Sequence, residues 1–158
     1  MQYYIRKAKE EDIEGILKII NDPELESVVL KKSKEDIKNN NYFIAKIDNK
    51  IVGVVGYKLW ENGNTKPEVI SLVVDKNYQG RGVGFDLVKF CLEEIKSKGF
   101  KSVFTFTGVS RLFVKFGFKK VDVSRFSEKV LSDCANCPKN INGPTIMPCD
   151  EVAMELIF

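Results

Sequence analysis

A glycine-rich segment between a buried strand and an amphipathic helix is the feature that most constrains this chain. An apolar run ending at Val74 is followed by the loop Gln79–Gly84, and apolar residues at helical spacing begin at Val83. A strand, a tight loop and a helix in this order bring backbone N–H groups and the positive end of a helix dipole to one point, which favours an anion such as a phosphate. Glycines also serve tight turns and close helix packing, so the loop alone leaves that interpretation open.

Two better-known phosphate loops do not fit this segment. The spacing Gly80-x-Gly82-x-Gly84 differs from G-x-G-x-x-G, and no acidic ribose ligand stands at the expected offset on a following strand. The nucleotide loop that ends in G-K-[ST] is absent from the sequence. The segment therefore predicts neither a dinucleotide fold nor a P-loop.

The other periodicities predict an α/β (α+β) fold in which an antiparallel run of strands precedes the glycine loop. The chain is expected to form one domain, residues 1–158, with an irregular Cys-containing loop at about 126–149. The expected elements, in chain order, are strand 3–8, helix 13–20, a short helix opened by a capping box at 33–36, strands 42–47, 51–60 and 68–74, a helix from 83 to about 99, strand 101–106, helix 110–116, and strands 118–123 and 151–158.

Composition narrows the chemistry. The 158 residues include no histidine, which excludes Ser-His-Asp and Cys-His catalysis, His-ligated zinc and imidazole as a general base. Any acid–base chemistry therefore falls to carboxylates, Lys, Tyr, Cys or water. With 25 Lys and Arg against 22 Asp and Glu, the net charge of +3 is too weak to indicate a nucleic-acid partner.

Hydropathy and cysteine usage bear on the compartment. The longest apolar stretch, Ile51–Tyr57, is too short for a membrane span, and the N-terminus does not have the pattern of a signal peptide. We therefore expect a cytoplasmic protein with no membrane partner and no structural disulfides. Cys91 falls on an apolar helical stripe and is predicted as core. Cys134, Cys137 and Cys149 form C-x2-C-x11-C and could be reduced thiols, metal ligands or a reversible disulfide. Because structural zinc needs four ligands, we expect no required metal.

The glycine loop resembles the acetyl-CoA signature Q/R-x-x-G-x-G/A of the GCN5-related N-acetyltransferases (GNAT), matched by Gln79, Gly82 and Gly84. The strand 71–74, the Phe116–Phe118 turn and the order of elements match as well. This resemblance implies a mixed, mostly antiparallel sheet, flanked by helices and splayed between its fourth and fifth strands, with acetyl-CoA in the gap. The residues it assigns to acetyl-CoA are Leu72, Val73, Val74, Gln79, Gly80, Arg81, Gly82, Val83 and Gly84.

A narrower likeness is to the acetyltransferase domain of N-acetylglutamate synthases. The segments 5–8, 29–33 and 103–107 are similar to that family, as is the long tail E-K-V-x-x-D-C-x-x-C-P … C-D-E-x-A-M at 128–154. Ile70 stands where that family often has Arg, and the interval from Cys137 to Cys149 is longer than usual. The likeness implies acetyl transfer to the α-amino group of an amino acid, glutamate first, as in arginine biosynthesis. The alternatives are a GNAT enzyme for another small-molecule or protein amine, and a non-catalytic acyl-CoA-binding module.

The mechanism that this resemblance implies relies on a carboxylate. Glu68 occupies a position where the resembling synthases carry a glutamate, so it is the expected base, acting through water, although surface glutamates are common. A backbone N–H near Val73 or Val74 would meet the oxyanion. Phe113 stands where many family members carry a tyrosine acid, so the thiolate would leave unassisted or take a proton from water.

An acidic acceptor requires cations. Arg can hold a carboxylate with two hydrogen bonds, which favours Arg6 and Arg111, with Lys32 and Lys58 as further candidates. Each of these could equally be a solvated surface charge. The expected partners are acetyl-CoA and a small-molecule amine, and a homodimer is left open.

Overall fold

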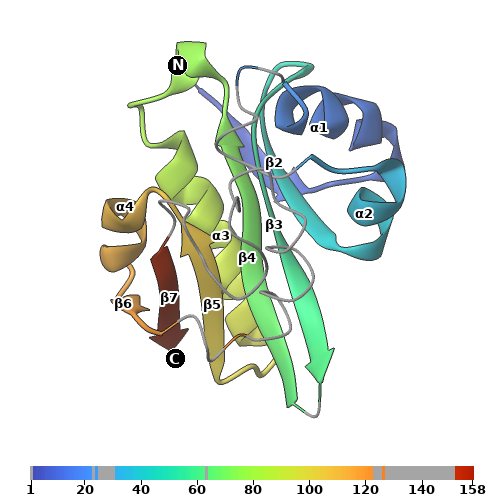
Figure 1. The fold of residues 1–158 in the computed structure, drawn as a ribbon. Coiled ribbons are helices and arrows are strands. Elements are labelled where there is room, and N and C mark those ends of the chain that lie inside the picture. The colour runs from blue at the N-terminus through green and yellow to red at the C-terminus, as the bar shows by residue number, and fades with distance from the viewer. Residues whose placement is uncertain (1, 23, 25–30, 63, 123–125, 127–151) are drawn as a thin grey trace.

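A mixed seven-stranded sheet forms the centre of the fold. The structure, a computed structural model, describes residues 2–22, 24, 31–62, 64–122, 126 and 152–158. The strand order is β1-β2-β3-β4-β5-β7-β6, antiparallel throughout except that β4 runs parallel to β5 (Figure 1). The strands are β1 (Tyr4–Lys7), β2 (Asn41–Ile47), β3 (Lys50–Asn62), β4 (Asn64–Val74), β5 (Ser102–Thr107), β6 (Lys119–Lys120) and β7 (Val152–Ile157).

Helices cover both faces of this sheet. They are α1 (Ile13–Ile20), α2 (Lys34–Asn39), α3 (Val83–Ser97) and α4 (Ser110–Val114), with 3-10 turns at Glu10–Asp12 and Lys76–Tyr78. Side chains alternate along β2, so that Phe43 and Ala45 join the core under α3, while Tyr42 and Ile44 join the core under α1 and α2. The two cores therefore lie on opposite faces of the same strands, and α3 crosses behind β4 and β5 in Figure 1. None of the helices in the described residues has the length and apolar character needed to span a bilayer.

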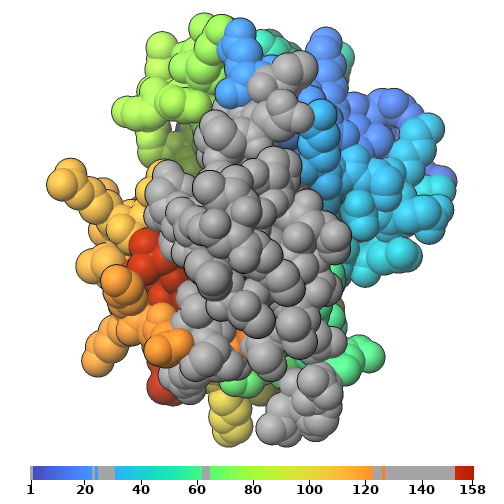
Figure 2. All heavy atoms as spheres, viewed as in Figure 1, coloured from blue at the N-terminus to red at the C-terminus, as the bar shows by residue number. Residues whose placement is uncertain are grey.

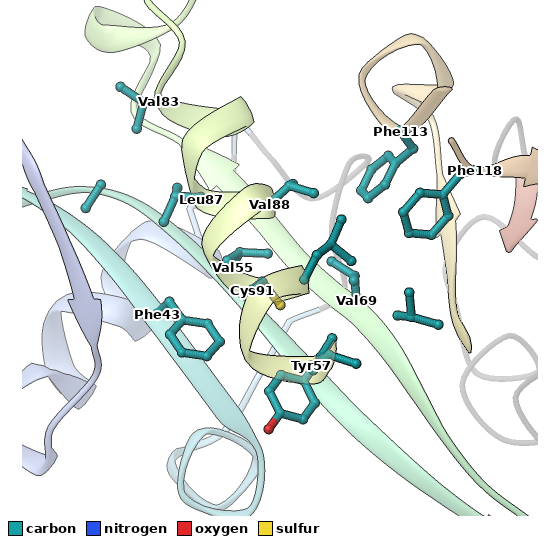
Figure 3. Packing of buried hydrophobic residues seen from close by; sticks show 14 of the residues in the cluster. Phe43, Val55, Tyr57, Val69, Val83, Leu87, Val88, Cys91, Phe113 and Phe118 are labelled. Carbon is teal, nitrogen blue, oxygen red and sulfur yellow. The ribbon is translucent and has the colours of Figure 1, made fainter. Parts of the chain in front are cut away.

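The α3 core contains the apolar stripe that the sequence predicts. Val83, Leu87, Val88 and Cys91 point from α3 onto the sheet, and all are buried (Figure 3). Cys91 is fully buried in this core, as predicted, and its burial raises the pKa of the thiol. Cys134, Cys137 and Cys149 lie outside the described residues, and within the described residues no group of Asp, Glu, His or Cys converges as metal ligands do.

Three predicted boundaries are wrong. The β3–β4 hairpin is longer than expected, because the polar residues on either side of the turn pair across it as far as Asn62 and Asn64. The strand expected at 118–123 is reduced to Lys119–Lys120, and α4 ends at Val114 rather than at residue 116. Cross-strand hydrogen bonds, which local composition does not encode, extend the hairpin.

Candidate active site

The glycine loop adopts left-handed backbone at two positions. Gly80 has φ +73° and Gly82, the residue before α3, has φ +88°. A side chain at either glycine would meet open space, so their conformation, and not crowding, requires glycine. At Gly84 φ is ordinary and a Cβ would lie 3.6 Å from Val74 Cγ2, a normal contact. The N–H groups of the first turn of α3 have no partner within the helix, and the two glycines add no side chain beside them.

Hydrogen bonds hold the loop in this shape. The Asp75 side chain accepts from the Asn77 N–H at 2.9 Å and lies 3.2 Å from Lys50 Nζ, and together these interactions keep the pKa of Asp75 below its ordinary value despite partial burial. The Gln79 amide donates to the Val74 carbonyl at 2.9 Å. Gln79 therefore links the loop to the end of β4 by a hydrogen bond. The sequence alone predicts only that Gln79 binds acetyl-CoA.

Beside this loop the sheet is splayed. Across the described residues, β4 and β5 pair at Glu68 with Phe104 and at Val69 with Thr105, and the pairing ends there. Thr105 adds a side-chain hydrogen bond to the Val69 carbonyl at 2.9 Å. From Ile70 to the end of β4 the two strands separate, which is the gap predicted between the fourth and fifth strands. Leu72, Val73 and Val74 belong to the part of β4 that lies beyond the pairing with β5.

A β-bulge interrupts β4 at the start of the gap. The register with β3 changes from Val54–Val73 to Gly56–Ile70, and Ser71 has φ +57°. A non-glycine residue in this region stores strain, which clusters at functional sites. The Tyr42 hydroxyl lies 3.3 Å from Ser71 Oγ. Burial is the main cause that raises the pKa of Tyr42 to about 12, and the charges of Asp36 and Glu68 add to it, while the hydrogen bond to Ser71 acts in the opposite direction. The Tyr42 side chain is therefore a neutral phenol at physiological pH.

Glu68 lies on the same face of β4 as Ile70, opposite α3. It is directly across from Lys58 on β3 and from Phe104 on β5, and only 1% of it is exposed. Its Oε1 accepts a hydrogen bond from Trp60 Nε1 at 2.9 Å, and Lys58 Nζ lies 3.9 Å from the centroid of the indole ring. The predicted base is thus a fully buried carboxylate beside the splayed gap, not an exposed charge at a strand edge.

The predicted cations are dispersed. Arg6 binds the Asp12 carboxylate with contacts of 2.7 and 3.1 Å, and Asp12 is 4% exposed. Burial acts to raise the pKa of Asp12, but Arg6, the Lys9 N–H and Lys46 together hold it below its ordinary value. Arg6 therefore already has a carboxylate partner within the protein, which ties β1 to the start of α1.

Arg111 and Lys32 lie on different sides of the molecule. Arg111 belongs to α4, which contacts β7, whereas Arg6 belongs to β1, five strand spacings or roughly 24 Å away. Lys32 precedes α2, where its backbone exchanges two 2.8 Å hydrogen bonds with the Asn21 side chain. In Figure 2 the α4 and β6 atoms and the α2 atoms lie on opposite sides of the visible face. The fold therefore does not bring Arg6, Lys32 and Arg111, the predicted acceptor-binding cations, together around a single site.

The sequence by itself does not identify three side chains that lie around Glu68 and the β4 bulge. Tyr42, Trp60 and Ser71 are a buried aromatic, a strand aromatic and a strand serine, and nothing in the local pattern distinguishes them from ordinary sheet residues. They come together only through the pairing of β2, β3 and β4. Phe113, which the sequence identifies as lacking a phenol, is buried in the structure and packs edge-on against Phe118 at 5.2 Å (Figure 3).

Comparison with known proteins agrees with this architecture. The sequence profile of the Acetyltransferase (GNAT) family matches residues 13–118. The chain therefore belongs to the GNAT family of N-acetyltransferases. An uncharacterized N-acetyltransferase of Chlorobaculum tepidum is 29% identical over 95% of this chain and 93% of its own length. An amino-acid acetyltransferase of Shewanella oneidensis is 27% identical over 79% of this chain. The aligned part is only 28% of the length of that relative.

Solved structures share the fold at low sequence identity. A Mycobacterium tuberculosis protein in complex with CoA and NLQ superimposes with a TM-score of 0.76 at 19% identity, covering 98% of this chain and 99% of that one. N-acetylglutamate synthase from Neisseria gonorrhoeae, complexed with coenzyme A and N-acetyl-glutamate, gives a TM-score of 0.79 at 19% identity. That match covers 99% of this chain but 35% of the synthase.

Proposed function

We propose that the protein transfers the acetyl group of acetyl-CoA to the α-amino group of an amino acid, with glutamate as the first candidate. The observation that carries this proposal is the buried Glu68 carboxylate on β4, at the point where β4 and β5 part. The glycine loop, which follows the far end of β4, would supply the anion site. The likeness to N-acetylglutamate synthase and to an amino-acid acetyltransferase supports the choice of acceptor.

The proposed path of acetyl-CoA follows the loop and the gap. The pyrophosphate would lie on the N–H groups of residues 79–84, with Arg81 adding positive charge. The pantetheine chain would extend β4 by hydrogen bonds to Leu72 and Val74, which border the gap. The thioester would then lie near the bulge at Ser71, on the same strand as Glu68.

Each chemical step has a candidate group. Glu68 would accept the proton of the acceptor ammonium through a water molecule, since its side chain is buried. A backbone N–H at Val73 or Val74 would stabilise the oxyanion of the tetrahedral intermediate. Collapse of that intermediate breaks the C–S bond, and the CoA thiolate leaves as such or takes a proton from water, because Phe113 has no hydroxyl.

For the acceptor carboxylates, Lys32 and Lys58 take precedence over Arg6. The Ser33 N–H holds the pKa of Asp36 below its ordinary value, and the charges of Lys32 and Lys58 add to that effect. On β3, Lys58 is directly opposite Glu68. Asp36 in turn acts on Tyr42, which connects this group to the face that carries Glu68. Arg111, on the β5 and β7 side of the gap, stays a predicted acceptor-binding residue.

Thiol release from acetyl-CoA across a panel of amino acids tests the proposal. We expect turnover with glutamate above that with other amino acids. Glu68→Gln should lower kcat by roughly 10²-fold or more, the usual effect of removing a general base. Glu61→Gln, an exposed carboxylate on β3, is the matched control and should leave the rate unchanged.

The panel also separates the alternatives. Background rates with glutamate and glutamine, but turnover with another amine, would reject the acceptor and keep the enzyme class. Ile70, which stands where the synthases often have Arg, is the observation that favours this second candidate. Tight CoA binding without transfer to any amine would instead indicate a binding module.

A further inference from the structure

The Glu68 carboxylate is hydrogen-bonded to the indole N–H of Trp60, a donor that can fix the orientation of a catalytic base. Removing a carboxylate from water is costly unless hydrogen bonds compensate, and Glu68 is 1% exposed. An indole N–H can only donate, so the 2.9 Å contact with Trp60 has a fixed sense, with the carboxylate as acceptor. Unlike Arg or Lys, an indole brings no net charge to this bond. It can orient the carboxylate through one directional hydrogen bond from a neutral donor.

The indole is itself held in place. Trp60 and Lys58 are two residues apart on β3 and therefore lie on the same face, where Lys58 Nζ stands 3.9 Å from the ring centroid. Trp60 also packs against the small core of Phe104 and Phe126, whose rings stack at 4.1 Å. A cation over the face of the ring withdraws electron density from it, which strengthens the N–H as a donor.

We propose that Trp60 is a positioning residue, which fixes the Glu68 carboxylate in the orientation required for proton transfer. The catalytic role rests on the proposed function. The contact between the two side chains does not, and because Trp60 is the single tryptophan of the chain, intrinsic tryptophan emission comes from this site alone.

The spectroscopic experiment compares the tryptophan emission maximum of the full chain in the wild type, Glu68→Ala and Glu61→Ala. We expect the maximum to shift in Glu68→Ala, which removes the acceptor of the indole N–H, and to stay unchanged in Glu61→Ala, an exposed carboxylate on the same strand as Trp60. An emission maximum that does not move in folded Glu68→Ala would overturn the proposal. This result does not depend on any acceptor being identified.

The kinetic experiment uses Trp60→Phe, which keeps an aromatic ring and removes the N–H. We expect kcat to fall about tenfold while the KM for acetyl-CoA changes less than twofold, because the residue does not touch that substrate. Tyr57→Phe is the matched control: it lies on the same strand, faces α3 instead, and should leave kcat unchanged. Circular dichroism and the thermal midpoint verify that both variants fold.

The outcomes separate the two proposals. A wild-type kcat in folded Trp60→Phe overturns the positioning role even if the emission is coupled to Glu68. If the wild-type protein acetylates no amine, the proposed function fails, and the emission experiment alone supports or overturns the assignment of Trp60 as the partner of the carboxylate.

Discussion

At the scale of single residues, the three glycines of the loop are not equally required to be glycine. Gly80 and Gly82 have left-handed backbone and open space around them, whereas Gly84 has helical backbone and room for a methyl group beside Val74. The sequence pattern treats all three alike. Only the backbone angles show that Gly82 is required for its conformation and that Gly84 is not.

This difference predicts unequal effects of alanine. Gly82→Ala places an L-residue in left-handed backbone at a cost of about 1–2 kcal/mol, which should distort the loop and weaken CoA binding by roughly tenfold. Gly84→Ala should bind CoA within about twofold of wild type. Titration calorimetry with CoA measures both dissociation constants. Equal losses in the two variants would contradict the assignment of these roles.

At the scale of elements, the structure explains why β1 and α1 are held together. Asp12 is buried at the start of α1, where the Arg6 side chain and the Lys9 N–H, at 2.7 Å, both donate to it. The amphipathic pattern predicts α1 correctly, and the capping box predicts α2, with Ser33 Oγ accepting from the Asp36 N–H at 3.2 Å. The sequence pattern does not reveal the contact between the elements, because Arg6 and Asp12 meet only when β1 and α1 pack.

The lowered pKa of Asp12 sets the sign of a pH effect on stability. A carboxyl whose folded pKa lies below its unfolded value stabilises the protein above the unfolded value, near 4, and loses that contribution as the pH falls through the folded value. Asp12→Asn should therefore lower the free energy of unfolding by about 2 kcal/mol at pH 6 and by less at pH 3. Urea unfolding at both pH values measures this, and a difference that stays constant would refute the ion-pair account.

At the scale of the whole molecule, position in the sheet decides which cations can reach an acceptor. Arg6 is on the edge strand β1, three strand spacings or roughly 14 Å from β4, which carries Glu68. Lys58 is directly opposite Glu68 on the neighbouring strand. Residue type favours arginine for a carboxylate, but the topology favours the lysine.

Two substitutions test this conclusion. Arg6→Gln should lower the free energy of unfolding by about 2 kcal/mol, because it removes charged hydrogen bonds to Asp12, and should leave the acceptor KM unchanged. Lys58→Gln should raise the acceptor KM by about tenfold with little loss of stability, since it faces the proposed acceptor side. Steady-state kinetics and urea unfolding measure both. A raised KM in Arg6→Gln with unchanged stability would restore the original prediction for Arg6.

By itself, the sequence determined the family, the order of elements, the glycine loop between a strand and a helix and the absence of imidazole chemistry, since each depends on local spacing or on residue identity. Only the tertiary structure decided the left-handed angles at Gly80 and Gly82, the bulge at Ser71 and the Trp60–Glu68 contact. These features depend on strand register and on which side chains meet across the sheet. Register arises from pairing between distant segments, which no local pattern encodes.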